Sequence, residues 1–180
     1  MGQTKYAFPT SAPSVNKPFV TDRAVVAGDT VYHLDCHQPT ASARTIQCGP
    51  KERYALSEDL ARIRHSCDPN VAFDLSSADR REWHVRAVKD IEVGTPLTYF
   101  YPSTEWTMDA PFECTCGART CLGTIYGAKQ LEREALMRRP HLNPWILFDE
   151  QRHAGSNSKC VACGEGARIR GRWACACSRL

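Results

Sequence analysis

The residues of this chain best suited to chemistry are four cysteines in two separated segments. Cys114, Cys116 and Cys121 are spaced by one and four residues, and Cys67 lies far upstream within the run Arg-His-Ser-Cys-Asp-Pro-Asn. Three thiolates so close in sequence cannot complete the tetrahedral shell of a structural zinc ion, so a fourth ligand must come from elsewhere. Cys67 is the best-placed candidate. We therefore expect a four-cysteine zinc site that ties the C-terminal third of the chain to its middle.

Length and composition allow one ordinary domain and a small appendage. The chain has 180 residues, of which 42% are hydrophobic, so a packed core can form. Charged residues make up 24% and the formal net charge is +3, which does not mark a dedicated nucleic-acid binder. No apolar run approaches the length that spans a bilayer, so we expect no membrane partner.

Ten cysteines are many for a chain of this length. The N-terminus lacks the apolar stretch of a secretory signal, which indicates an intracellular, reducing compartment where disulfides are rare. The sequence does not decide between nucleus and cytosol. An extracellular protein that has lost its leader is the alternative, but the clustering of the cysteines at metal-ligand spacings favours zinc over a disulfide framework.

Short β-like stretches dominate the first two thirds of the chain, which predicts many short strands joined by turns. The predicted strands lie at residues 19–20, 24–26, 30–34, 83–88 and 96–101, with one or two more within 43–56, and turns are predicted at 28–29 and 90–94. Residues 58–63 predict one helical turn. Helical spacing predicts a helix over 127–139, ended by Pro140, and a shorter helix over 144–152. The predicted class is therefore a β-rich α+β fold.

Several segments together resemble one known family. Residues 64–70 and 91–101 look like the two halves of a SET-domain core, and residues 114–123 resemble the post-SET zinc segment. Residues 20–34 are similar to the first SET hairpin. The resemblance spans roughly residues 15–127, with the motifs in the family's order, and three motifs in sequence are more specific than any one alone.

The resemblance implies a SET-like fold of short strands with a pseudoknot-like core, a post-SET four-cysteine zinc segment and C-terminal helices. The expected divisions are an irregular N-terminal arm (1–18), the SET-like core (19–111), the zinc segment (112–127), terminal helices (128–154) and a basic, cysteine-rich tail (155–180). With sulfur in all four positions the zinc would be structural and would leave no place for a reactive water.

The chemistry that the resemblance implies is methyl transfer from S-adenosylmethionine to an amine, most often a protein lysine. The sulfonium methyl must meet the amine lone pair in line, and the ammonium must first lose its proton. By position, Tyr101 is the expected catalytic tyrosine. Tyr99 is expected at the channel position, where a hydroxyl holds a water, narrows the site and favours few methylations. Outside these motifs, both would be ordinary strand aromatics.

Four further residues are expected at the cofactor. The resemblance implies that His65 contacts it through its backbone, and that Phe112 and Leu122 pack near the adenine. Arg64 stands where the family has asparagine, which puts a permanent charge beside a cationic sulfonium unless the side chain reaches the cofactor carboxylate.

A second departure concerns the N-terminal cofactor contact, where residues 16–19 (Asn-Lys-Pro-Phe) replace the family's Gly-x-Gly turn. The segment between Leu34 and Arg64, which helps to form the substrate groove in the family, is also short. Three hypotheses follow: a protein-lysine methyltransferase, a SET-like scaffold recruited for small-molecule chemistry, and a non-catalytic binding module. The partner is accordingly a protein or peptide lysine, or a small molecule.

The C-terminal tail holds a second set of thiols at metal-ligand spacing. These are Cys160, Cys163, Cys175 and Cys177. They predict either a second zinc site or a basic tail with incidental thiols. The arginines of this tail allow at most weak contact with nucleic acid or another acidic partner.

Overall fold

The computed structural model describes residues 17–34, 44–147, 167–169 and 172–174. The chain divides into two compact units, 1–147 and 148–180. In the second unit, β10 (Ala167–Ile169) and β11 (Arg172–Ala174) pair as an antiparallel hairpin. The predicted second zinc site, at cysteines 160, 163, 175 and 177, lies outside the described residues.

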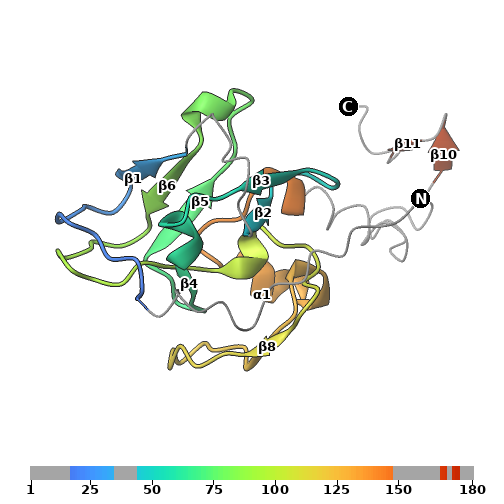
Figure 1. Cartoon of the computed structure of the whole chain (residues 1–180). Helices are drawn as coiled ribbons and strands as arrows, with labels where there is room; N and C mark the ends of the chain where they lie inside the picture. Colours follow the sequence, from blue (N-terminus) through green and yellow to red (C-terminus); the bar gives the residue numbers. More distant parts are fainter. Residues whose placement is uncertain (1–16, 35–43, 148–166, 170–171, 175–180) are drawn as a thin grey trace. The chain divides into compact units, whose positions relative to one another are not determined.

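The first unit is built on a three-stranded antiparallel sheet (Figure 1). Its order is β1 (Thr30–His33), β6 (His84–Ala87) and β5 (Val71–Asp74), with β6 in the middle. Val85 of β6 stands opposite Phe73 and Tyr32. The valines of these strands and Phe73 are buried, as expected for a sheet with one face on the core.

A short parallel pair brings the two predicted SET segments together. In this pair β4 (Arg64–His65) lies beside β7 (Thr98–Tyr99), with His65 opposite Tyr99. The Asn70 side chain supports the crossing, because its Oδ1 accepts the Thr98 N–H at 2.8 Å and its Nδ2 donates to the Pro96 carbonyl at 2.9 Å. Residues 64–70 therefore run against 96–101.

Two small hairpins flank this crossing. One joins β2 (Thr45–Gln47) to β3 (Arg53–Ala55), and the other joins β8 (Phe112–Glu113) to β9 (Thr124–Ile125). The remaining elements are 3-10 turns η1 (Leu60–Arg62), η2 (Arg80–Glu82), η3 (Tyr101–Ser103) and η4 (Ala128–Gln130), the helix α1 (Arg133–Met137), and a helical turn at 144–147. The hairpin of β8 and β9 encloses the cysteine-rich segment.

Two groups of buried apolar residues hold the first unit together. The main core extends from Val25 to Tyr99 and packs on the three-stranded sheet. A smaller core gathers Phe100, Ala128, Leu136 and Ile146. The buried Asn143 side chain joins the two regions, because its Oδ1 accepts the Leu75 N–H at 3.0 Å and its Nδ2 donates to the Ser103 carbonyl at 3.0 Å.

The predicted strands and the observed ones agree best in the first 90 residues. The predicted strand stretches 30–34, 43–56 and 83–88 contain β1, β2 with β3, and β6, and the predicted helical turn at 58–63 contains η1. Residues 19–26 contribute only isolated bridges, Val20 to Pro96 and Val25 to Ile91.

The predicted strand over 96–101 is shorter than expected. It ends at Tyr99, because Pro102 favours the 3-10 turn η3 that begins at Tyr101.

The predicted helix over 127–139 is interrupted. Leu131 and Glu132 are extended, with ψ of 139° and 141°, and separate η4 from α1. The N–H groups of Ala128 and Lys129 donate to the carbonyls of Glu105 and Trp106, so tertiary contacts fix the chain direction before a helix can propagate. The second predicted helix begins at Pro144 as expected, and its residues after 147 lie outside the described part.

Candidate active site and metal centre

The four cysteines predicted to share a metal ion converge in the structure. The sulfur atoms of Cys67, Cys114, Cys116 and Cys121 all lie within 4.8 Å of one another, and those of Cys67 and Cys114 are 3.9 Å apart. Zinc–sulfur bonds of about 2.3 Å in a tetrahedron place the sulfurs about 3.8 Å apart. The cluster therefore fits a four-thiolate zinc shell.

The hairpin of β8 and β9 and the loop within it present three of these thiols. The Cys114 N–H donates to the Gly123 carbonyl at 2.8 Å, which closes the hairpin, and the Cys121 N–H donates to the Ala118 carbonyl at 2.9 Å. Gly117 turns the loop with a φ of 69°, a conformation that favours glycine. Local turn chemistry thus aims the three thiols at Cys67.

The thiols do not ionise independently. Burial raises the pKa of Cys114 to about 12, and the neighbouring thiols add to this. Burial also acts on Cys116, but hydrogen bonds from the Ala118 N–H and from neighbouring groups lower its pKa to about 6. Four thiolates in one cluster need a cation for charge balance, and zinc supplies that charge when it binds.

Tyr101 lies next to this cluster within a group of aromatic rings. Its ring centroid is 5.2 Å from that of His65, 5.9 Å from that of Phe112 and 4.6 Å from that of Tyr99. The Tyr101 hydroxyl donates to the Ile63 carbonyl at 3.4 Å. The parallel pair of β4 and β7 thus brings His65 of the first SET motif beside Tyr101 of the second. Phe112 of the zinc segment packs against both.

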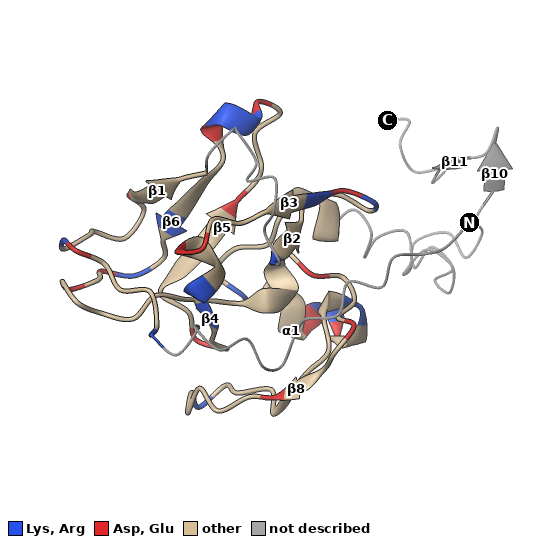
Figure 2. Cartoon of the chain, in the orientation of Figure 1, with Lys and Arg blue, Asp and Glu red and all other residues tan. Residues whose placement is uncertain are grey.

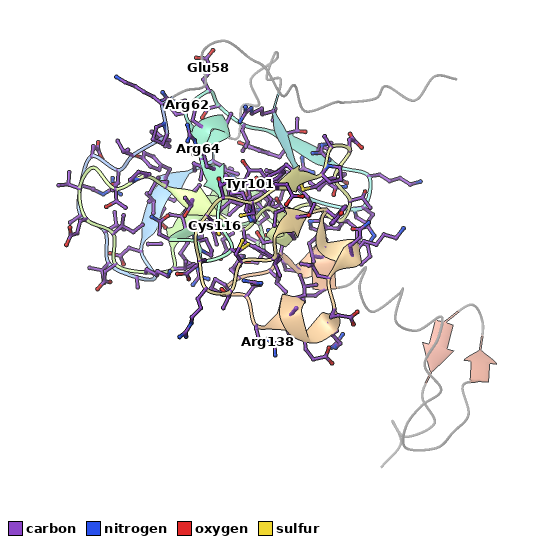
Figure 3. The ribbon with its side chains drawn as sticks, turned by 90° about the horizontal axis from the view of Figure 1, so that it is seen from below. Glu58, Arg62, Arg64, Tyr101, Cys116 and Arg138 are labelled. Atoms are coloured by element: carbon purple, nitrogen blue, oxygen red, sulfur yellow. The ribbon has the colours of Figure 1, made fainter. Side chains whose placement is uncertain are left out.

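The Tyr101 hydroxyl stays protonated at neutral pH. Burial raises its pKa, and the charges of Arg44 and Arg64 offset part of that rise. In Figure 3, Arg64 is labelled beside Tyr101, with Glu58 and Arg62 farther toward the edge. A neutral phenol among cations can donate or accept a hydrogen bond, and an ammonium group is disfavoured beside the same cations.

Tyr99 belongs to the main core and is buried. Its ring packs edge-on against Phe73 at 4.7 Å, and burial raises the pKa of its hydroxyl well above the usual value. The hydroxyl also interacts with Thr104, which is itself buried. The structure therefore places Tyr99 in the main core, with its ring against that of Tyr101. Its expected channel role stays a prediction.

The four expected cofactor residues lie in three different places. His65 and Phe112 contact each other at 5.6 Å and both contact Tyr101. Leu122 packs against the smaller core, and its N–H points at the Cys67 sulfur at 3.4 Å. Arg64 is exposed on the neighbouring strand position. Their roles at the cofactor stay predictions.

The segment that replaces the Gly-x-Gly turn contacts the second SET motif. The Leu97 N–H donates to the Phe19 carbonyl at 2.8 Å, and the Phe19 ring lies 5.0 Å from that of Tyr32. A large side chain here packs on the sheet, where glycine would leave the backbone bare. The substitution is thus accommodated by the fold.

Sequence reasoning missed Glu105, which is only 2% exposed. Its carboxylate oxygens accept from Arg53 Nη2 at 3.1 and 3.2 Å, and one also accepts the Gln47 N–H at 3.1 Å. Burial raises the pKa of Glu105 to about 7, although Arg53 opposes this. The carboxyl group ties the hairpin of β2 and β3 to the segment after Tyr101. Nothing in the local sequence marks a partner 52 residues away.

Arg139 was also missed, although it touches the metal centre. Its Nη1 donates to the Cys67 carbonyl at 2.7 Å, and its guanidinium lies over the Phe100 ring at 4.7 Å. Arginine commonly stacks on aromatic faces while it donates hydrogen bonds. Arg139 therefore fixes the end of α1 against the turn that carries Cys67.

Charges of both signs are interspersed over the described residues. Figure 2 shows basic and acidic residues side by side at η2 and on α1. Among these residues no helix is long and apolar enough to cross a membrane.

Comparison with known protein families shows which family the chain belongs to. The model of the SET domain matches residues 11–102. This chain belongs to the SET-domain family. The matched stretch contains both strands of the crossing, and the four-cysteine cluster joins it to the segment that follows, as in a post-SET zinc site.

Several curated proteins are similar over part of the chain. Methyltransferase flvH of Aspergillus flavus is 41% identical over 108 residues, which cover 60% of this chain and 58% of that protein. Histone-lysine N-methyltransferase mes-4 of Caenorhabditis elegans is 32% identical over 93 residues, or 42% of this chain and 10% of that protein. The H3 lysine-9 specific enzyme dim-5 of Neurospora crassa is 34% identical over 79 residues, or 36% of this chain and 24% of that protein. The similarity thus spans less than two thirds of each of these relatives.

Proposed function

We propose that this protein is a SET-type methyltransferase that transfers a methyl group from S-adenosylmethionine to an amine. The observation that carries the proposal is the crossing of β4 and β7, which puts Tyr101 against His65 beside the four-cysteine cluster. Three proteins similar to part of this chain are named as methyltransferases. Membership of the family supports the reaction, and the contacts support the residues.

The proposed role of Tyr101 is to orient the amine. S-adenosylmethionine supplies an activated methyl group when it is bound. The Tyr101 hydroxyl oxygen and the Ile63 carbonyl oxygen, 3.4 Å apart, offer two acceptors close together. They can hold the N–H groups of an amine and leave its lone pair free to face the methyl group.

The same surroundings favour loss of the amine proton. The hydroxyl is largely buried and lies close enough to Arg44 and Arg64 for their charges to shift its pKa. Low polarity and nearby cations both lower the pKa of an ammonium group. The acceptor would therefore reach Tyr101 as a neutral amine, which the transfer requires.

The zinc in this proposal is structural. Cys67, Cys114, Cys116 and Cys121 would fill all four coordination positions, so the ion would hold the late segment in place and would not act on the substrate. Phe112 and Leu122, which this segment carries, would close over the adenine, and His65 and Arg64 would contact the rest of the cofactor.

A protein lysine is the first candidate acceptor, since two of the relatives are named as histone-lysine N-methyltransferases. A small-molecule amine is the second. The observation in its favour is the pair of cations at Tyr101, because Arg44 and Arg64 repel the basic residues that surround lysines in histone tails. The name of flvH states no acceptor.

Calorimetry with S-adenosylmethionine, followed by turnover assays, tests the proposal. We expect the donor to bind to the zinc-loaded protein, and Tyr101→Phe to lower kcat about 100-fold or more with little change in thermal stability. Histone peptides and simple polyamines serve as alternative acceptors. Absence of donor binding would favour the non-catalytic module, and a wild-type kcat in the variant would remove Tyr101 from the mechanism.

A further inference from the structure

The imidazole of His65 contacts two functional groups at once. Its Nδ1 receives the backbone N–H of Tyr101 at 3.2 Å, and its Nε2 lies 3.3 Å from the Cys67 sulfur. A backbone N–H can only donate, so Nδ1 must be the unprotonated nitrogen. The ring proton is then on Nε2, which points at the sulfur. The geometry therefore fixes both the tautomer and the direction of each hydrogen bond.

At the sulfur, the Nε2–H of His65 is one of two donors. The other is the N–H of Leu122, at 3.4 Å from the same atom. Hydrogen bonds from N–H groups favour thiolate over thiol and reduce the excess negative charge of a four-thiolate zinc centre. Cys67 is also the only one of the four ligands that comes from the SET crossing and not from the loop between β8 and β9.

On its Nδ1 side, the His65 ring accepts the backbone N–H of Tyr101, which has no acceptor in a strand pair. Strand β7 ends at Tyr99 and η3 begins at Tyr101, so the Tyr101 N–H is among the first donors of a helical turn, which lack intrahelical acceptors. His65 accepts it and packs edge-on against the Tyr101 ring. The imidazole thus sets where the chain leaves the strand, and with it the position of the Tyr101 hydroxyl.

We propose that the His65 side chain is a positioning residue that couples the metal centre to Tyr101. When zinc holds Cys67, the sulfur fixes Nε2–H, the ring plane is set, and Nδ1 holds the Tyr101 backbone. The coupling is reciprocal, so a correctly placed Tyr101 also stabilises the metal shell. The inference rests on the zinc site and the Tyr101 role proposed above, and it adds a side-chain task to a residue expected only to contact cofactor through its backbone.

Three substitutions separate the two bonds. His65→Phe keeps a flat ring and removes both. His65→Asn retains an acceptor near Nδ1 and loses the donor to sulfur, whereas His65→Gln retains a donor near Nε2 and lacks the acceptor position. His84→Phe, at a partly buried position on β6, is the matched control.

The readouts do not require the methyl donor. They are the rate of zinc release to a chelator, the sulfur-to-cobalt absorption band of the cobalt-substituted protein, and the amide signal of Tyr101 by nuclear magnetic resonance. We expect His65→Phe to speed zinc release about 10- to 100-fold and to shift the Tyr101 amide signal. His65→Asn should change the rate of zinc release and leave the Tyr101 amide signal in place. His65→Gln should shift the Tyr101 amide signal and have a smaller effect on the rate of zinc release.

Zinc release and a cobalt band in His65→Phe that match those of the His84→Phe control would overturn the inference. So would a Tyr101 amide signal that does not move in either His65→Phe or His65→Gln. Failure of the wild type to bind S-adenosylmethionine would overturn the proposed transfer and leave the coupling standing, because none of these readouts uses the donor.

Discussion

The sheet region and the region after Tyr99 are held together in different ways. The main core contains 17 buried apolar residues on a three-stranded sheet, whereas the smaller core after Tyr99 contains four. Within residues 100–147, all of them described, the strands β8 and β9 have two residues each and the helix α1 has five. Such short elements bury too little apolar surface to order themselves alone.

What the later region has in place of a large core is a set of specific ties to the first. The four-cysteine cluster connects through Cys67, Arg139 connects to the Cys67 carbonyl, and Glu105 connects to Arg53. The candidate active site lies where the two regions meet, at Tyr101. The comparison indicates that the sheet region provides the scaffold. The contacts between the two regions, and the zinc site above all, then determine whether the residues of the candidate active site are held in place.

The largest effect should come from removing a thiol of the later region. Cys121→Ser should release zinc and expose the backbone of residues 122–147, while the amides of β6 stay protected. Zinc binding in small peptide sites is worth about 10–16 kcal/mol, so the loss of one ligand is measurable. Elemental analysis measures the zinc content, and hydrogen exchange measures the protection of the backbone amides. Cys48→Ser, a half-buried thiol outside the cluster, is the control, and protection that survives in 122–147 without zinc would contradict the account.

The opposite perturbation belongs to the sheet region. Phe73→Ala empties the centre of the main core and should destabilise the protein by about 3–5 kcal/mol, without loss of zinc from the molecules that remain folded. Denaturant unfolding gives the free energy. Val93→Ala, at a position 65% exposed, should change it by less than about 0.5 kcal/mol. Equal effects of the two substitutions would mean that the sheet is not the scaffold.

The tie at Glu105 should produce a pH dependence. Its carboxyl pKa rises from 4.5 to about 7 on folding because of burial, so the folded state binds the proton more tightly than the unfolded chain. The stability that this group contributes is present below about pH 4.5 and falls as the pH rises toward 7, by about 3 kcal/mol.

Glu105→Gln removes that slope, so the difference in unfolding free energy between wild type and variant should change with pH by this amount. Taking the difference cancels the separate pH dependence of zinc binding. Glu92→Gln, at an exposed carboxylate, should give a curve parallel to the wild type. A parallel curve for Glu105→Gln as well would show that its carboxyl group titrates alike in both states.

The smallest of the four effects is expected at the entrance to η4. Gly127 has a φ of 127°, and a Cβ there would lie 2.7 Å from the Trp106 carbonyl oxygen. Gly127→Ala should therefore lower the free energy of unfolding by roughly 1–3 kcal/mol. The loss of protection should be larger in the later region than in the sheet region. Hydrogen exchange of α1 against β6 separates the two. Gly28→Ala, where φ is 98° and an added Cβ would meet nothing within 4 Å, is the control without a clash. Equal loss of protection in α1 and β6 of Gly127→Ala would contradict a local effect.

The sequence predicts the parts of this arrangement that depend on rare residue types. Cysteines at metal-ligand spacing indicated that Cys67 meets Cys114, Cys116 and Cys121 before any coordinates, because few other functions need that pattern. Strands such as β1 and β6 were also predicted, since their alternating residues reflect one buried face. The order of the SET motifs indicated that the two segments of the crossing lie together.

The rest depends on tertiary contacts that no local pattern records. The strand β5 was not predicted, because three buried residues in a row show no alternation. The pairs of β4 and β7 and of β8 and β9 are too short to show a period. The interruption at Leu131 follows from bonds to Glu105 and Trp106, far upstream. The partners of Glu105 lie in the hairpin of β2 and β3, and those of the His65 ring are set by the crossing, so both residues look ordinary in the sequence.

The most direct test of the central claim is zinc X-ray absorption on protein in which the tail cysteines 160, 163, 175 and 177 are replaced by serine. We predict one zinc per chain with four sulfur neighbours at about 2.3 Å, and three sulfurs or no zinc when Cys67→Ser is added. Four sulfurs retained after Cys67→Ser, or no zinc while the Cys67 thiol is still present, would contradict it.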